Sequence, residues 1–207
     1  MRKSEELAEL VGILLGDGSF YIKDNSHHQL DIAFNLLEEE HYCKFVENLL
    51  KKLTSESTYR KYDIQRNCVH LRLNKKKPVL DLLSVSLIKS GNKIKNDVTI
   101  PKWIMNDRKF LKACLRGLID TDGSFYRLKP HWPNLVQLSF KSNTKRLLKD
   151  VRSAFVKLGF HPSRIFGNRI VITRQEEIKK YLKDVGTNNK IIAPSFSGQE
   201  NLPLEKE

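Results

Sequence analysis

The chain has 207 residues, of which 40% are hydrophobic and 29% charged. This apolar content is enough for packed hydrophobic cores, in one large or two small domains. Lys and Arg exceed Asp and Glu by 37 − 24 = 13, and the excess is uneven: residues 98–207 carry 21 basic and 10 acidic side chains, against 16 and 14 in residues 1–97. We therefore expect a polyanionic partner, bound more strongly by the C-terminal half.

Local features exclude a membrane protein and a disulfide-stabilised secreted protein. The longest apolar run, from Leu10 to Leu15, is far shorter than the ~20 residues of a membrane-spanning helix, and no secretory signal precedes it. Cys43, Cys68 and Cys114 are odd in number and show no CxxC pairing, which favours free thiols in a reducing compartment. We expect an intracellular protein of the cytoplasm or nucleoid, with no membrane partner.

The first half is predicted to follow the order helix, hairpin, helix, hairpin, helix. Ser4 can cap a helix that begins at Glu5, where acidic side chains suit the positive helix end. Polar and apolar residues then alternate in strands, and apolar residues recur at helical spacing between the hairpins. The predicted elements are helices at 5–15, 38–53 and 78–88, and strands at 19–23, 29–36, 59–65 and 68–74.

The second half is predicted to repeat this order after a short connector. Residues 98–106 contain Pro101 and Trp103, and we expect them to be packed; Asp107 can cap the helix that follows. The predicted elements are helices at 107–120, 144–158 and 175–184, strands at 124–128 and 135–141, and a hairpin at 163–174 that turns at Gly167-Asn168. The predicted domains are an N-terminal half at 1–97, the connector at 98–106, a C-terminal half at 107–192 and an extended tail at 193–207.

The two halves correspond because one motif occurs twice. Residues 10–21 read LVGILLGDGSFY and residues 115–126 read LRGLIDTDGSFY, so that Asp17 aligns with Asp122 at an offset of 105 residues. Residues four apart share one face of a helix. Two facing stripes of small side chains would let two helix backbones approach closely. The stripes are Ala8, Gly12 and Gly16 in the first copy, and Ala113, Gly117 and Thr121 in the second.

The fold class that follows is α+β, with two pseudosymmetric halves of about αββαββα each. The two central helices pack at the interface, and two saddle-shaped antiparallel sheets form a groove suited to double-stranded DNA. Arg and Lys suit guanine or phosphate, and Asn and Gln suit adenine. Any one of these residues alone would more often be a solvated surface residue, so the prediction depends on the set. The candidate DNA-binding residues are Ser19, Tyr21, Lys23, Gln29, Asp31, Asn35, His70, Arg72, Asn74, Ser124, Tyr126, Gln137, Ser139, Lys141, Arg164, Phe166, Arg169 and Thr173.

Asp17 and Asp122 are the candidate catalytic acids. An acid at a helix C-terminus is electrostatically unfavourable, because its charge opposes the helix dipole there. Its repetition at the end of both central helices therefore suggests a bound cation. Mg²⁺ prefers carboxylate and carbonyl oxygens and water, and phosphodiester hydrolysis benefits from a divalent ion that activates water and neutralises the phosphate. We expect one carboxylate for each DNA strand.

The second motif, LRGLIDTDG, resembles the signature of the LAGLIDADG homing endonucleases, and LVGILLGDG is a looser version of it. The resemblance covers nearly the whole chain in two halves, as in the single-chain members of that family. It implies that Asp17 and Asp122 bind the metal, with the backbone carbonyls of Gly16 and Thr121 near the ions. It also implies a structural role for Asp120, where the first copy has Leu15, and basic side chains around the cleavage centre, for which the candidates are Lys93 and Lys190.

The function implied is that of a monomeric, intron-encoded or free-standing homing endonuclease. It would hydrolyse both strands of a long asymmetric DNA target and leave 3′-hydroxyl overhangs. Mg²⁺ is the expected cofactor, with Mn²⁺ or Ca²⁺ able to replace it in binding, and the lack of a P-loop argues against a nucleotide cofactor. The alternative is a non-cleaving nucleic-acid-binding protein or an RNA intron maturase. The presence of both acids favours the nuclease, and the lack of a Cys or Ser start and a His-Asn end disfavours an intein.

Overall fold

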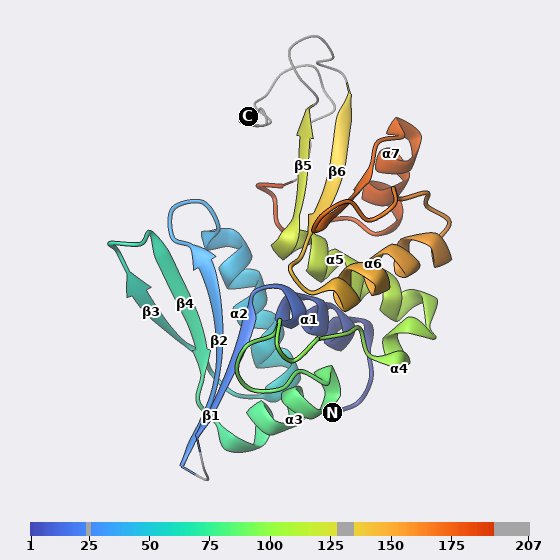
Figure 1. Ribbon diagram of the computed structural model, residues 1–207. Coiled ribbons are helices and arrows are strands. Elements are labelled where there is room, and N and C mark those ends of the chain that lie inside the picture. The colour runs from blue at the N-terminus through green and yellow to red at the C-terminus, as the bar shows by residue number, and fades with distance from the viewer. Residues whose placement is uncertain (24–25, 128–134, 193–207) are drawn as a thin grey trace.

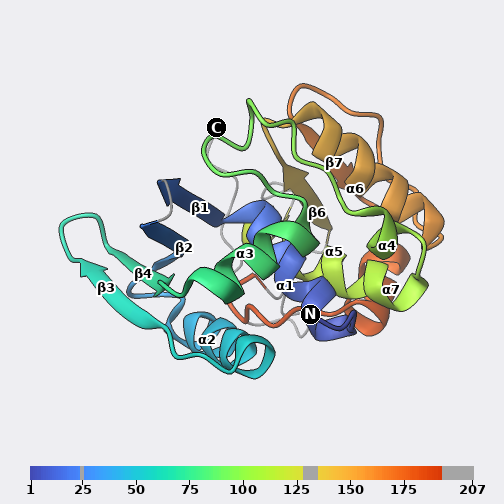
Figure 2. The same ribbon diagram turned by 90° about the horizontal axis from the view of Figure 1, so that it is seen from below.

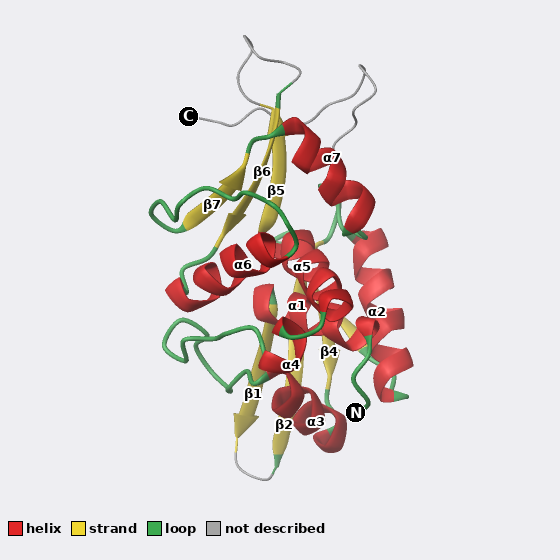
Figure 3. Cartoon of the chain, turned by 90° about the vertical axis from the view of Figure 1, so that its right-hand side faces the viewer, coloured by secondary structure: helices red, strands yellow, loops and turns green. Residues whose placement is uncertain are grey.

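The computed structural model describes residues 1–23, 26–127 and 135–192. Its centre is a pair of helices, α1 (Glu5–Gly16) and α5 (Arg108–Asp122), one from each motif. Two antiparallel sheets lie at opposite ends of the molecule, with the helix pair between them (Figures 1 and 3). This arrangement confirms the predicted α+β fold with two central helices.

The other elements alternate between strands and helices in both halves. The first sheet has the strand order β1-β2-β4-β3 and the second has the order β5-β6-β7. All neighbouring strands are antiparallel. The bounds are β1 (Gly18–Lys23), β2 (His27–Asn35), α2 (Glu40–Thr54), β3 (Tyr59–Asp63), β4 (Cys68–Leu73), α3 (Lys76–Ser86), α4 (Lys102–Met105), β5 (Gly123–Arg127), β6 (Val136–Lys141), α6 (Lys145–Lys157), β7 (Arg169–Ile172) and α7 (Gln175–Asp184).

Each sheet has an apolar face and a polar face. In the first sheet Phe20 lies opposite Leu30, and Ile32 opposite Leu71, and all four side chains are buried. Helices α1, α2 and α3 lie on this apolar side (Figure 2). Alternate residues of a strand point to opposite faces, so the intervening polar residues form the other side, which we call the polar sheet face.

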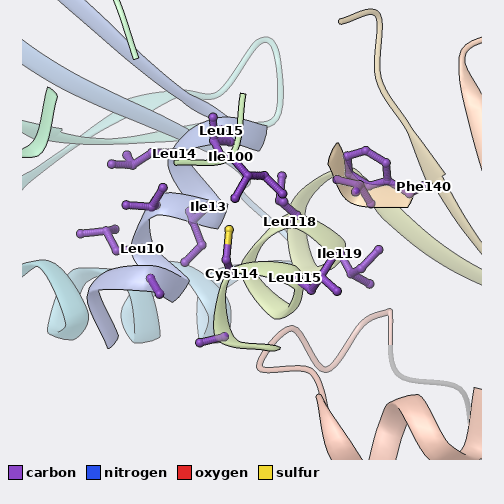
Figure 4. Packing of buried hydrophobic residues seen from close by; sticks show 14 of the residues in the cluster. Leu10, Ile13, Leu14, Leu15, Ile100, Cys114, Leu115, Leu118, Ile119 and Phe140 are labelled. Atoms are coloured by element: carbon purple, nitrogen blue, oxygen red, sulfur yellow. The ribbon is translucent and has the colours of Figure 1, made fainter. Parts of the chain in front are cut away.

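The two central helices approach closely, as the stripes of small residues predict (Figure 4). A Cβ atom on Gly12 would lie 2.2 Å from the carbonyl oxygen of Cys114, and one on Gly117 would lie 2.3 Å from the carbonyl oxygen of Glu9. Both separations are shorter than any real contact. Only glycine therefore allows this backbone-to-backbone packing.

A charged pair also crosses the interface between these helices. Arg116 of α5 donates from Nε and Nη2 to the two carboxylate oxygens of Glu9 in α1, at 3.0 and 2.7 Å. A third bond runs from its Nη1 to the carbonyl oxygen of Val185, at 2.9 Å. The Glu9 side chain is buried, so the bidentate pair compensates for the loss of hydration of both charges.

The predicted helix caps are present. The hydroxyl oxygen of Ser4 accepts from the backbone N–H of Leu7 at 3.2 Å. One carboxylate oxygen of Asp107 accepts from the backbone N–H groups of Lys109 and Phe110, at 2.8 and 3.1 Å. These bonds satisfy donors that the first helical turn leaves without a partner, and they set where α1 and α5 begin.

The connector packs against both halves, as expected, and includes the short helix α4. Its Val98 and Ile100 side chains are buried. Thr99, through its hydroxyl, and Ile100, through its backbone N–H at 3.0 Å, donate to Asp150 of the second half. The indole N–H of Trp103 donates to the carbonyl oxygen of Val85 in the first half at 3.1 Å.

The second sheet differs from the prediction, because within the described residues it has three strands instead of four. The segment before β7 makes only isolated contacts with it, between Ser163 and Val171 and across the tight turn from Phe166 to Arg169. Ile165, predicted to face the core, is 37% exposed. The first half instead has a continuous β3–β4 pairing, with residues 64–67 joining the two strands.

Some expectations fall outside the described residues: the tail at 193–207, the turn residues Asp24 and Asn25, and the end of the strand predicted at 124–128. Among the helices that are described, none combines the length and apolar character needed to cross a bilayer.

Candidate active site

The two candidate acids stand at the adjacent ends of the central helices. Asp17 is the C-terminal cap of α1, where its N–H donates to the carbonyl oxygen of Ile13 at 3.0 Å. Asp122 is the last residue of α5, and strands β1 and β5 begin at the next residues. A Cβ atom on Gly16 would lie 3.5 Å from Oδ2 of Asp122. The structure therefore brings the end of the first motif against the acid of the second.

Both carboxylates have raised pKa values. Partial loss of hydration raises the pKa of Asp17 to about 7; the Asp122 charge also raises it, while the Lys93 ammonium opposes the change. Loss of hydration also raises the pKa of Asp122, again against the effect of Lys93. The Asp17 side chain is accessible to solvent, so water screens part of its shift, whereas Asp122 is half-buried. Two acids whose charges repel form a site that favours a cation.

Lys93 reaches this site from the loop after α3. Its ammonium group donates to the carbonyl oxygen of Leu15 at 3.2 Å and to that of Gly16. Burial lowers the pKa of Lys93, and the charges of Asp122 and Asp17 oppose that change. A positive charge at the negative end of α1 is electrostatically favourable.

A pocket of about 310 Å³ opens beside these groups. It is lined by Gly16, Lys93, Asp122 and the predicted DNA-binding residue Lys141. Four further polar residues line the pocket, and the sequence analysis did not assign them to the site because they lie in loops or at a helix start with no catalytic motif: Ser142, Asn143, Thr144 and Asn168.

Lys190 does not join the site. Its side chain is exposed, and it is not among the residues that line this pocket. Its neighbour Asn189 is buried instead, and donates from Nδ2 to the carbonyl oxygen of Asp120 at 3.0 Å and to Oε1 of Glu39 at 2.8 Å. The dipeptides Asn92-Lys93 and Asn189-Lys190 suggested equivalent roles for the two lysines. In the structure, the lysine contacts the central helix end in the first half, and the asparagine does so in the second half.

Asp120 anchors the segment that follows α7. Its carboxylate accepts from the hydroxyl of Thr187 at 2.5 Å and from the backbone N–H of Asn188 at 2.8 Å. Asn188 in turn donates from Nδ2 to Oε1 of Glu9 at 2.5 Å. The first motif has Leu15 at the position of Asp120 and no equivalent network. Sequence reasoning did not find Glu39, Thr187, Asn188 or Asn189, since their partners are distant in the chain.

The residues present fit a divalent cation. Two carboxylates and backbone carbonyl oxygens are the hard ligands that Mg²⁺, Mn²⁺ and Ca²⁺ prefer. The ammonium of Lys93 against the carbonyl oxygen of Gly16 shows that this position already attracts positive charge. The hydroxyl of Thr121 donates to carbonyl oxygens of its own helix, those of Gly117 and Leu118, at 3.0 and 3.1 Å.

In the first half, the candidate DNA-binding residues lie on the polar sheet face. Strand register sets Ser19 opposite Asp31, Tyr21 opposite Gln29, and Asp31 opposite Arg72. Asn35 is already engaged, because its side-chain oxygen accepts from the backbone N–H groups of Leu37 and Glu38 in the turn before α2. The exposed members are Ser19, Tyr21, Lys23 and Asn74, and the half-buried ones are Gln29, Asp31, Asn35, His70 and Arg72.

In the second half, two candidates are not on the surface. Tyr126 and Ser139 are only 7% and 1% exposed, so the prediction that they line an open groove is wrong for the structure as it stands. Both occupy the expected face by register, opposite Gln137 and Ser124 respectively, but that face is more closely covered in this half. The exposed members are Lys141, Arg164, Phe166 and Thr173, and the half-buried ones are Ser124, Gln137 and Arg169.

Comparison with known proteins gives three kinds of match. Residues 109–186 match the family model of the LAGLIDADG-like domain. The chain is 25% identical over 204 residues to the replication factor C small subunit of Methanocaldococcus jannaschii, a match that spans 88% of this chain but only 11% of that protein.

The third kind is similarity to solved structures. The homing endonuclease I-DmoI in complex with DNA and Mn superposes with a TM-score of 0.61 at 15% identity, over 88% of this chain and 96% of that one. The meganuclease I-SmaMI bound to uncleavable DNA gives 0.57 at 12% identity, over 89% and 85%. These likenesses establish the fold. The family model thus identifies residues 109–186 as a LAGLIDADG-like domain, and the chain as a whole, with its two motifs, shares the fold of these single-chain LAGLIDADG proteins.

Proposed function

We propose that the protein is a site-specific endonuclease that hydrolyses one phosphodiester bond in each strand of a DNA duplex. The observation that carries this proposal is the meeting of the two motif ends, where Asp122 lies beside Gly16 and Lys93 contacts the same helix end. Binding of DNA by the structural relatives supports it, because I-DmoI is seen with DNA and Mn and I-SmaMI with DNA.

The chain's own residues would divide the work at the site. Asp17 and Asp122 would hold divalent cations, with the carbonyl groups of Gly16 and Thr121 nearby, and Mg²⁺ is the proposed ion. A bound ion of this kind neutralises the scissile phosphate and lowers the pKa of an attacking water. Lys93, half-buried and positive, would stabilise the charge that develops on the phosphate.

The rest of the proposal concerns the target and the state of the protein. The polar sheet faces would contact base edges and phosphates on either side of the site. Because the two halves differ in charge, we propose a long asymmetric target, cut to leave 3′-hydroxyl overhangs by a monomer of the cytoplasm or nucleoid. We also propose that residues 1–97 and 107–192 are its two half-site units.

The test is cleavage of a randomised duplex library. The purified protein would be incubated with the library in Mg²⁺ and, separately, in EDTA, and the cut ends would be sequenced after ligation to an adaptor that requires a 3′-hydroxyl. Cutting of a single sequence family in Mg²⁺ alone is the expected result. Duplexes that are bound but never cut, in Mg²⁺ or Mn²⁺, would contradict the proposal and support a non-cleaving nucleic-acid-binding protein.

A further inference from the structure

An acidic residue lies at the centre of the polar sheet face of the first half. Asp31 of β2 accepts from Nε of Arg72 at 2.5 Å and is 2.7 Å from Nδ1 of His70, both on β4. The Nε2 group of Gln29 donates to the same carboxylate at 3.4 Å. The side chains of Asp31 and Arg72 are only 14% and 20% exposed, so this cluster is well ordered by its neighbours.

The fold does not require this cluster. Ser139 takes the place of Asp31 in the second sheet, because Ser139 lies opposite Ser124 just as Asp31 lies opposite Ser19. The residue opposite Ser139 on the next strand is Val171, whereas the residue opposite Asp31 is Arg72. The uncharged pair Ser139 and Val171 thus occupies the equivalent position in the second half.

An acid on a surface that faces DNA also has a cost, because it repels phosphate. The acid has a role if it orients a cationic side chain, that of Arg72, for base recognition and not only for phosphate binding. Guanidinium has five N–H donors in a fixed fork. Nε is held by Asp31, and the side chain of Tyr59, opposite Arg72 on β3, also interacts with the guanidinium. When DNA binds, the two terminal nitrogen atoms are the pair that can bind O6 and N7 of guanine together.

We infer that Asp31 is a specificity-determining residue that positions Arg72 to read one guanine in the major groove, with His70 held beside it. This inference rests on the proposed function, since it assumes that the polar sheet face binds duplex DNA. Asp31 does not touch the base in this arrangement; it acts through Arg72. Its charge also keeps the guanidinium from binding phosphates indiscriminately, so the pair contributes selectivity more than affinity.

The experiment is binding selection from randomised duplexes, without cleavage, in Ca²⁺. Wild-type protein, Asp31→Ala, Asp31→Asn and Arg72→Lys would be compared by sequencing the retained DNA. In wild type we expect a guanine preference at one position, and Asp31→Ala and Arg72→Lys should both reduce it by about 10–100-fold at that same position. Preferences at other positions should be unchanged, and Asp31→Asn, which keeps an acceptor oxygen, should retain part of the guanine preference.

Lys61→Met is the matched control. Lys61 is exposed on β3 opposite His70, on the same face, but it has no bond to Asp31. Its loss should weaken binding to all sequences alike. Thermal unfolding of each variant shows which are folded, and if Asp31→Ala does not fold, the comparison of Asp31→Asn with Arg72→Lys decides.

Two results would overturn the inference. If the folded variants bind duplexes with the base preferences of wild type, or with a uniform change in affinity, Asp31 and Arg72 form a merely structural ion pair. If no variant and no wild-type protein retains duplex DNA, the proposed function itself fails and the inference fails with it. The two cases differ in whether wild-type protein retains DNA.

Discussion

The two motif acids have unequal neighbours at the level of single residues. Lys93 supplies a positive charge at the end of α1, while the equivalent Lys190 is exposed and Asn189 takes its place near α5. The second motif also carries Asp120, whose carboxylate is fully engaged by the segment after α7. The surroundings of the two carboxylates are therefore unequal, although both are expected to hold the cation.

Replacing Asp122 with Asn should abolish double-strand cleavage while leaving DNA binding largely intact. The amide has nearly the same volume but removes a negative charge that would hold the cation. We expect at least a roughly 100-fold lower rate of cleavage, since the lost group acts on the reacting phosphate, and an unchanged dissociation constant for duplex DNA in Ca²⁺. Asp17→Asn should behave alike.

Asp81→Asn serves as the control for these variants, because Asp81 pairs with Lys77 within α3 and does not line the pocket beside Asp122. It should cleave as wild type does. If Asp17→Asn and Asp122→Asn both cut both strands at near wild-type rates, the assignment of the acids is wrong.

The stability of the metal-free protein should fall as pH rises from about 4 to about 7. Burial raises the pKa of Asp120 from 3.8 to about 7, although Thr187 and Asn188 donate to it. The folded state therefore holds a proton that the unfolded state has already released in this range, and the free energy of unfolding decreases, by about 1.4 kcal/mol for each pKa unit of difference. Urea unfolding in EDTA at several pH values measures this decrease.

Asp120→Asn should reduce that dependence, because the amide does not titrate, whereas Asp17 and Asp122, whose pKa values are also raised, still contribute to it. Asp81→Asn gives the contrasting result: Lys77 lowers the pKa of Asp81, so this pair contributes stability that is lost as pH falls. A pH profile of Asp120→Asn that parallels wild type would show that Asp120 is not the titrating group.

At the level of elements, the central helix pair determines where the acids lie. Gly117→Val should destabilise the protein by more than the typical ~1–3 kcal/mol of core overpacking, since its Cβ would lie 2.3 Å from a backbone oxygen of α1. Moving the helices apart also moves Asp17 from Asp122, and a displacement on the order of 1 Å can reduce a rate ~100-fold. Cleavage should therefore decrease further than stability explains.

Lys109→Val is the control, because Lys109 is exposed on the same helix and the substitution introduces the same β-branched side chain. Thermal midpoint and cleavage rate would be measured for both variants below their unfolding transitions. A Gly117→Val protein that is stable and active would mean that the helices do not need to meet at this face.

Elements with local signals were predicted well from the sequence. The small stripes and the caps at Ser4 and Asp107 each depend on residues within a turn or two of one another, and the structure confirms them. The alternation of polar and apolar residues correctly predicted which side chains face the core, wherever only one face of the strand is buried. The signal for the fourth strand of the second sheet was a turn at Gly167-Asn168, but a tight turn does not by itself create a paired strand.

The candidate site could be predicted only in part, because its remaining members depend on contacts between distant segments. The network from Asp120 to Asn189 joins residues more than 60 positions apart, and Asn189 reaches Glu39 across 150. Strand alternation put Tyr126 and Ser139 on the right face, but it contains no information about how deeply that face is covered.

At the level of the whole molecule, the net charge of +13 should make DNA binding steeply dependent on salt. Each phosphate neutralised adds about 0.9 to the slope of log K against log salt for a duplex. With several Lys and Arg side chains from each half, we expect a slope steeper than roughly −4 between about 50 and 200 mM salt. Fluorescence anisotropy with a labelled duplex in Ca²⁺ gives this slope, and a value near zero would exclude a groove that contacts the backbone.

The Glu9–Arg116 pair means that the two halves of the chain cannot replace each other. At the 105-residue offset, Arg116 corresponds to Val11 and Glu9 corresponds to Cys114, so each member of the pair exists in one copy only. Two first halves brought together would bury two glutamates with no cation, and two second halves would bury two arginines against cysteines. Removing one partner of a buried pair costs about 3–5 kcal/mol. Each half therefore depends on the other for this pair, and a symmetric dimer of either half alone would lose it.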